Sequence, residues 1–203
     1  MEDLDIPVYE IVLDEFETGH GLNRISLVKN PAIKNNFIAL SDNSIKLKLD
    51  EDKRELVGPL LIPNQKILRE NKRLGKFYIN FSAETIQSIL GKYQHSNLSQ
   101  SVNLYHSDKL VKAFTKEIWI KEFAEDKSNA YGFNLDIGTL FAKVKVQDTD
   151  FWAEYVKTSL VEGFSIELVS DIVKKFENKL EADTTNYEAI FNEVDLILKN
   201  LEK

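Results

Sequence analysis

Short runs of hydrophobic residues, many of them alternating with polar ones, dominate the first 170 positions of the chain. They are rich in β-branched and aromatic residues and are separated by Gly, Pro, Asn or Asp, a pattern that predicts β-strands. The predicted strands are 8–13, 24–28, 37–40, 45–49, 56–62, 76–81, 101–107, 113–123, 138–146 and 164–169. So many short strands would expose unpaired edges unless a sheet closed on itself. We therefore expect a mainly β protein of the α+β class, built as a small antiparallel β-barrel.

Two short helices are expected between these strands. Ser82 precedes the sequence AETIQSIL and is suited to cap a helix that ends near Gly91. Asp148 or Thr149 is suited to cap a second helix, which Gly163 would end.

The chain changes character after Ser170, because the following residues contain no Gly or Pro. Hydrophobic residues recur there at intervals of three and four, between Tyr187 and Leu201, which predicts an amphipathic helix. We therefore expect a β domain over residues 1–170 and a helical tail over residues 171–203. The tail's apolar stripe would support self-association or attachment to a scaffold.

The composition limits the function. The chain has no cysteine, so it has no disulfide, no thiolate metal site and no cysteine nucleophile. Its three histidines lack a zinc spacing and no glycine-rich phosphate loop occurs, so we expect no metal and no cofactor. A formal charge of −7 argues against nucleic acid as a partner. The acidic N-terminus and the lack of an apolar run of about 20 residues predict a cytosolic protein that does not contact a membrane.

Ser165 lies in the sequence VEGFSIELV, two residues after a glycine. The spacing is close to that of a nucleophile elbow, but an elbow places its serine between a strand and a helix. Here a helix precedes the serine and a strand follows it. Such a serine either only begins the strand or acts as a nucleophile in another architecture, and in the second case it needs a base within hydrogen-bonding reach.

His106 is the best candidate for that base. It ends an apolar strand in VNLYHSDK, where the rim of a barrel would lie, whereas His20 and His95 lie in polar, turn-like segments. A histidine at a strand end is more often structural than catalytic, so both interpretations stay open from the residues alone.

Eight linked motifs lie between residues 20 and 168: RISLVKNPAI, LVGPLLIPNQKILR, KFYINFS, NLYHS, KEIWI, EDKSNAYGF, GTLFAKVKV and FWAEYVKTSLVEGFSIE. Together they resemble the phage prohead serine proteases of the XkdF type. More distantly, the His–Ser pair is similar to the capsid maturation proteases of tailed phages, which share a β-barrel fold with herpesvirus assemblins. The resemblance implies a serine endopeptidase with Ser165 as nucleophile and His106 as base. It would cleave the scaffold, the major capsid protein and itself inside the immature prohead, in the host cytoplasm.

Two features depart from the pattern of the broader family. A segment like ISLVKNPA usually follows the nucleophile there but comes near the N-terminus here, which suggests a circular permutation. An acidic residue is common just before that segment, where this chain has Arg24. We therefore expect Glu117, in the strand after His106, to orient the imidazole, although a plain surface carboxylate fits it about equally well. Glu167 is the second choice, because it shares a strand face with Ser165.

Two other functions fit the same residues. The chain could be a catalytically inactive scaffold or capsid-assembly protein of the same fold, with the helical tail as its working part. It could also be a serine hydrolase that acts on small molecules and has no connection with capsids.

Overall fold

The computed structural model describes residues 6–14, 19–31, 38–39 and 53–175. Their strands form three sheets. The first has the order β11 (Asp171–Lys175), β1 (Val8–Val12), β6 (Gly75–Asn80), β5 (Ile67–Asn71). The second has the order β10 (Gly163–Val169), β2 (Gly21–Val28), β7 (Val102–Leu104). The third has the order β3 (Ile38–Ala39), β4 (Glu55–Leu61), β9 (Leu140–Val146), β8 (Ala113–Ile120).

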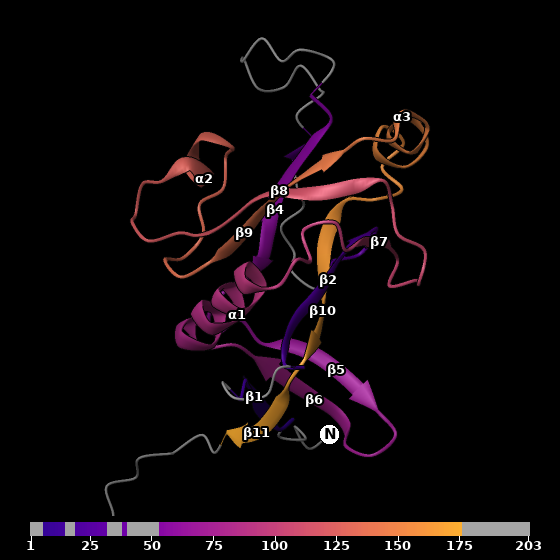
Figure 1. Cartoon of the computed structure of the whole chain (residues 1–203). Coiled ribbons are helices and arrows are strands. Elements are labelled where there is room, and N and C mark those ends of the chain that lie inside the picture. The colour runs from indigo at the N-terminus through magenta and orange to yellow at the C-terminus, as the bar shows by residue number, and fades with distance from the viewer. Residues whose placement is uncertain (1–5, 15–18, 32–37, 40–52, 176–203) are drawn as a thin grey trace, which may run out of the picture.

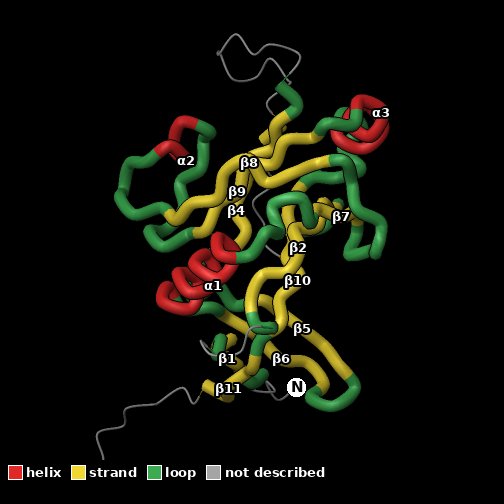
Figure 2. Tube along the Cα trace, in the orientation of Figure 1, coloured by secondary structure: helices red, strands yellow, loops and turns green. Residues whose placement is uncertain are grey.

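The helices are few and short. They are α1 (Ala83–His95), α2 (Lys127–Ala130) and α3 (Thr149–Phe151), which continues as a π-helical turn over Trp152–Val156. Most of the remaining described chain is strand and loop (Figure 2). The prediction of a mainly β, α+β protein is therefore confirmed.

The second sheet occupies the middle of the molecule. Figure 1 shows β2 and β10 running between the sheet of β4, β8 and β9 at one end and the sheet of β1, β5 and β6 at the other. One hydrophobic core joins them, with buried side chains such as Ile11, Ile25 and Leu56 from the three sheets. Helix α1 adds Ile86 and Ile89 to this core. The strands that we describe form three sheets around a common core, and no closed barrel is found among them.

The predicted caps of α1 and α3 are present. Ser82 accepts a hydrogen bond from the backbone N–H of Thr85, and Asp148 accepts from those of Asp150 and Phe151. Helix α1 continues past Gly91 to His95, so His95 lies in its last turn and not in a loop. Glycine inside a helix costs only about 1 kcal/mol, which the buried face of α1 offsets.

The region after Ser170 differs from the prediction of a helical tail at its start. Residues Asp171–Lys175 form β11, which pairs antiparallel with β1 from Val8↔Lys175 to Val12↔Asp171. The sequence DIVKK is too short to show a clear strand alternation. The prediction for the whole segment after Ser170 is therefore based on the helical periodicity between Tyr187 and Leu201. The first sheet therefore extends to Lys175, whereas the predicted amphipathic helix lies outside the described residues, as does the predicted strand 45–49.

The alternation of side chains gives the second sheet one buried face and one polar face. Ile25 and Leu27 of β2 and Phe164 of β10 are buried in the core. Because successive side chains point to opposite faces, Ser26 and Ser165 lie on the other face. They lie directly opposite each other in the antiparallel pairing of β2 with β10.

A close approach of the chain fixes the N-terminal end of β10. A Cβ atom on Gly163 would lie only 2.4 Å from Cγ of Pro31, a rigid ring that cannot turn away. We expect Gly163→Ala to lower the free energy of unfolding by about 1–3 kcal/mol, the usual cost of overpacking. Thermal melting of the purified protein measures this loss.

Gly91→Ala provides the matched control. A Cβ atom there meets nothing within 4 Å, and Gly91 lies inside α1, so alanine should raise stability by about 0.5–1 kcal/mol. Equal effects of the two substitutions would contradict the close approach of Pro31 to β10.

Candidate active site

Three strands bring polar side chains together on the outer face of the second sheet. Ser26 comes from β2, Glu167 from β10 and Asn103 from β7, which pairs parallel with β2 so that Asn103 lies beside Ser26. His106 follows two residues after the end of β7. The structure therefore joins one predicted site residue, His106, to the second-choice acid, Glu167, and to two residues that the sequence analysis did not select.

The carboxamide of Asn103 fixes the pattern of hydrogen bonds. Its Nδ2 donates to the backbone carbonyl of Ser107 and to Glu167 Oε1, both at 2.7 Å. Because both of these partners can only accept, the amide orientation is determined, and Asn103 Oδ1 must face Ser26. Ser26 Oγ donates its single proton to that oxygen at 2.5 Å.

The same pattern assigns the tautomer of His106. Its Nδ1 lies 3.0 Å from Ser26 Oγ and 3.4 Å from Glu167 Oε1. The Ser26 proton is already engaged, so both groups act as acceptors toward Nδ1, and Nδ1 carries the hydrogen of the neutral ring. Nε2 then holds the free lone pair, which is the arrangement that a general base requires.

Ser165 lies next to this network without joining it. It is paired with Ser26 across the two strands, and side chains in such a pair have Cβ atoms about 5 Å apart. Its side chain forms no hydrogen bond with any described residue, and neither does Nε2 of His106. The two predicted partners, Ser165 and His106, thus share one face of one sheet but are not hydrogen-bonded to each other.

The two serines differ in access to solvent. Ser26 is 0% exposed, whereas Ser165 is half-buried. A nucleophile has to reach the carbonyl carbon of its substrate, so Ser165 is the accessible serine of this site.

His106 is presented by a strained turn. Tyr105 and His106 both have positive φ, 52° and 56°, and Ser107 N–H donates to the carbonyl of Leu104 at 3.0 Å. Left-handed backbone costs an L-residue roughly 1–2 kcal/mol, and such turns usually contain Asn or Gly.

Contacts on three sides offset that strain. The backbone N–H of Tyr105 donates to the carbonyl of Leu27 at 3.1 Å, and Asn103 holds the carbonyl of Ser107. The Tyr105 hydroxyl donates to the carbonyl of Leu160 at 2.6 Å, in the loop that leads into β10. The turn that carries His106 is therefore tied to the strand that carries Ser165.

Arg24 balances the charge of Glu167. Its Nη1 lies 3.6 Å from Glu167 Oε2 and 3.5 Å from Asp108 Oδ1, and Arg24 is the cross-strand partner of Glu167. The other oxygen of Glu167 remains directed at Asn103 and His106. In the family that the chain resembles, an acidic residue is common at the position of Arg24. Here the acidic residue near His106 is Glu167, on the neighbouring strand β10.

Glu117, our first choice from the sequence, does not contact His106. Its two carboxylate oxygens pair with Lys127 and Lys143. Burial raises the pKa of Glu117, but the hydrogen bonds from the two lysines outweigh it and lower the pKa to about 2. The next strand in the chain, β8, belongs to a different sheet from β7, which explains why closeness in sequence was misleading.

Glu117 instead helps to hold the loop between β8 and β9. The Lys127 ammonium lies 4.0 Å from the centre of the Trp119 ring, and Trp119 donates to Asp126, the residue that caps α2. This cluster is structural, because each of its charged groups already has a partner.

The two other histidines lie elsewhere. His20 and His95 line a separate surface pocket between the start of β2 and the end of α1, and His20 Nδ1 accepts a hydrogen bond from the backbone of Asp14. In the described part of the chain, no cluster of three or more His, Asp or Glu side chains is suited to a metal ion. None of its helices is both long and apolar enough to cross a membrane.

Sequence reasoning missed Ser26 and Asn103, although both give a signal. Each interrupts an apolar strand, Ser26 between Ile25 and Leu27 and Asn103 between Val102 and Leu104. Both side chains are fully buried, and buried polar groups need partners. Two apolar strands that each carry one polar residue at the centre therefore indicate that the two polar side chains are hydrogen-bonded to each other.

Comparisons with protein-family models, with curated proteins and with solved structures find no match to this chain.

Replacing Glu117 by glutamine should affect stability and not the chemistry of His106. It leaves the largely buried Lys143 without a carboxylate, so the free energy of unfolding at pH 7 should fall by about 1–2 kcal/mol. Thermal melts of wild type and Glu117→Gln give the difference.

The pH dependence of that difference tests the cause. The pKa of Glu117 is lower in the folded protein, about 2, than the usual value of 4.5, so its stabilisation is complete above pH 4.5. It is lost as the pH falls from 4.5 toward 2, and the two melting curves should converge there. A constant difference down to pH 2.5 would contradict the assignment.

Proposed function

We propose that the chain is a serine endopeptidase of the phage prohead type, with Ser165 as nucleophile and His106 as general base. Glu167 replaces Glu117 as the group that orients the imidazole. Ser26 and Asn103 are positioning residues, since they act on His106 and not on the substrate.

The observation that carries the proposal is the position of His106 Nδ1 between Ser26 and Glu167, from which the tautomer is assigned. A serine hydroxyl is a poor nucleophile at neutral pH unless a base takes its proton. Here Nδ1 faces Ser26 and Glu167, which leaves the lone pair of Nε2 free on a ring that is 44% exposed. Ser165 is the accessible serine on the same sheet face.

The chemical steps follow the usual acyl-enzyme route. Ser165 Oγ attacks the scissile carbonyl while its proton passes to Nε2 of His106, and the imidazolium is stabilised by Glu167 through Nδ1–H. The C–N bond then breaks and the same proton goes to the leaving amine. Water attacks the resulting ester with His106 again as base, which releases the acid and restores Ser165. Because catalytic hydrogen bonds are often long before substrate binds, the missing Ser165–His106 contact is compatible with this route.

The position of β2 supports the suggested circular permutation. In the family that the chain resembles, the segment like ISLVKNPA follows the nucleophile. Here that segment begins in the second half of β2, and β2 pairs antiparallel along the full length of β10. A strand that directly followed β10 in the chain could occupy the same place through a hairpin.

The proposed capsid setting rests on the resemblance, and the proposed barrel rests on the resemblance and on the many short strands, whose edges closure would pair. We propose the major capsid protein and the scaffold as substrates, and self-association through the amphipathic helix predicted from the sequence between Tyr187 and Leu201. A closed barrel is proposed as the finer description of the three sheets, which already share one core. An inactive assembly protein of the same fold is the alternative function.

The first test separates the two serines. A fluorophosphonate probe should label the wild type at Ser165, because the probe's phosphorus takes the place of the carbonyl carbon. Ser165→Ala and His106→Ala should each lower the labelling rate by about three orders of magnitude or more, since nucleophile and base act as a unit. Ser26→Ala should lower it only about tenfold, because Glu167 still faces Nδ1.

Peptide mapping of the labelled protein by mass spectrometry identifies the modified serine. Label on Ser26 would reverse the roles of the two serines. A wild-type protein that resists labelling over several hours would favour the inactive assembly protein.

The second test compares the two acids. Glu167→Gln should slow labelling by about 10²–10³-fold with little change in melting temperature, whereas Glu117→Gln should lower the melting temperature and keep the rate. A Glu167→Gln variant that is labelled at the wild-type rate would show that Glu167 does not act on His106.

A further inference from the structure

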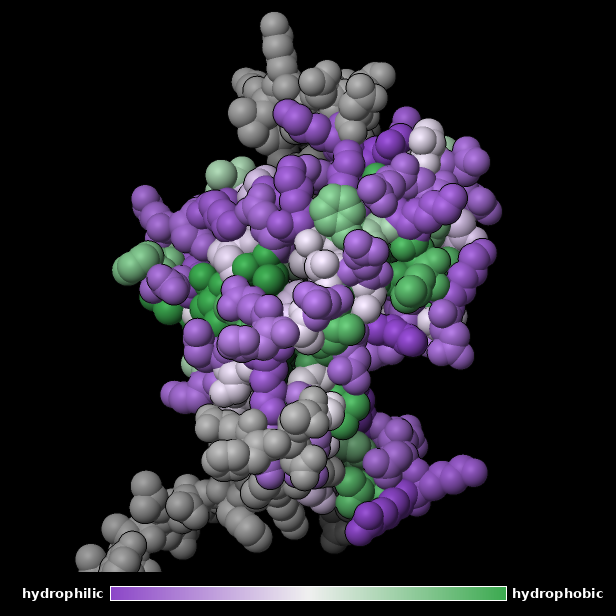
Figure 3. Space-filling model, in the orientation of Figure 1, coloured by the Kyte–Doolittle hydropathy of each residue, from purple (hydrophilic) through white to green (hydrophobic). Residues whose placement is uncertain are grey.

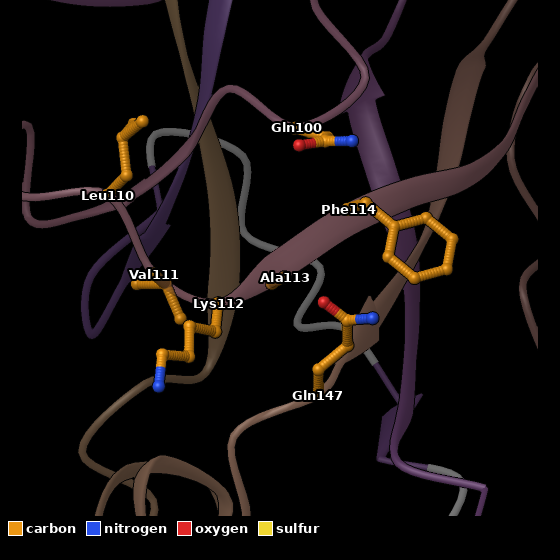
Figure 4. Close-up of a pocket in the computed structure, with 7 residues that line it drawn as sticks. All are labelled: Gln100, Leu110, Val111, Lys112, Ala113, Phe114 and Gln147. Carbon is orange, nitrogen blue, oxygen red and sulfur yellow. The ribbon is translucent and has the colours of Figure 1, made fainter.

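A groove of about 510 Å³ lies beside the start of β8. It is lined by Gln100, Leu110, Val111, Lys112, Ala113, Phe114 and Gln147. Figure 4 shows the amides of Gln100 and Gln147 near Phe114, with Leu110, Val111 and Lys112 on the segment that leads into the strand.

The groove is connected to the candidate active site through Leu110. This residue forms an antiparallel bridge with Asn103, and the backbone N–H of Val111 donates to the carbonyl of Val102 at 2.8 Å. Bridge partners point to the same face of a sheet, so Leu110 shares the face of Asn103 and Ser26. Val111 packs toward the core instead.

The separation suits an extended peptide. Phe114 lies four positions after Leu110, so their Cα atoms are at most about 13 Å apart, at roughly 3.3 Å per residue. The separation is shorter than this limit because the chain bends where the backbone N–H of Ala113 donates to the carbonyl of Val111. A substrate strand covers such a distance in four residues or fewer. One that is cut beside His106 can therefore place a side chain in the groove.

The lining favours an apolar side chain. Leu110 is 53% exposed and Phe114 only partly buried, and neither belongs to the main core. Tyr105 and Leu160, which are joined by a hydrogen bond, are also exposed. Figure 3 shows hydrophobic side chains gathered over β7 and the loop that follows it.

The polar groups of the groove suit a peptide main chain. The amides of Gln100 and Gln147 can each donate and accept hydrogen bonds. Lys112 is the charged residue of the lining, which contains no carboxylate, so a basic side chain would find no counter-charge there.

We propose that this groove binds an extended substrate peptide and selects a large apolar side chain within about four residues of the scissile bond. The inference rests on the proposed endopeptidase function and adds its specificity. Leu110 and Phe114 form the apolar walls, and the two glutamines hold the peptide backbone.

A cleavage-site profile tests the groove. The full-length wild type and the variants Leu110→Ala and Phe114→Ala are incubated with a proteome-derived peptide library, and the cut sites are read by mass spectrometry. In the wild type, large apolar residues should be enriched at one position within about four residues of the cut. Both variants should lose most of that enrichment, and kcat/KM for the best-cleaved peptide should fall about tenfold, mainly through KM.

Two controls separate folding and chemistry from specificity. Leu68→Ala removes a comparably exposed leucine from β5, outside the groove, and should keep the wild-type profile. Fluorophosphonate labelling should be unchanged in all three variants, because the small probe does not reach the groove.

The possible failures are distinguishable. A wild type that neither labels nor cuts contradicts the proposed function and this inference with it. Labelling and cutting without a preference at that position, or with a preference that survives Phe114→Ala, contradicts the groove alone. A change of oligomer mass in light scattering with an unchanged profile would show that a second copy of the chain occupies the groove.

Discussion

The buried carboxamide of Asn103 is the group on which the geometry of the site depends. An amide without partners would cost several kcal/mol in this position, so its two donors and its acceptor must be satisfied together. Its amide hydrogens are donated to the Ser107 carbonyl and to Glu167, and its oxygen accepts the hydrogen bond of the Ser26 hydroxyl. With those three groups committed, the only open role for the nearby nitrogen of His106 is that of a donor. One side chain on β7 thus determines the proton position on a ring with which it forms no hydrogen bond.

The strained turn at Tyr105 and His106 depends on the hydrogen-bond network around it. A turn with two left-handed residues, Tyr105 and His106, would relax if nothing held it, and strained backbone persists only where its surroundings over-determine it. Here the backbone of Tyr105 extends the pairing with β2, its hydroxyl reaches Leu160, and Asn103 holds the carbonyl that closes the turn at Ser107. The turn therefore stays in a conformation that aims His106 at the sheet face.

The sequence predicted most strands and the cap at Ser82, because alternation and capping are local signals. It could not predict which carboxylate lies beside His106, because that depends on which strands become neighbours. Glu117 is close to His106 in the chain, but β8 and β7 belong to different sheets, whereas Glu167 meets His106 across a pairing of distant segments. The sequence also failed to predict β11, because its partner is the first strand of the chain and such distant pairing leaves no local signal.

The count of protons decides between the two serines of the site. Ser26 contacts His106, yet its only proton goes to Asn103 and the nitrogen that it meets is the one that carries hydrogen. To act as a nucleophile it would have to break its bond to Asn103, which would leave a buried amide oxygen unsatisfied at a cost of about 1–3 kcal/mol. It would also have to invert the tautomer of His106 and emerge from full burial. Ser165 is half-buried and forms no such bond. The proposed mechanism therefore gives Ser26 the role of supporting the base and Ser165 the role of nucleophile.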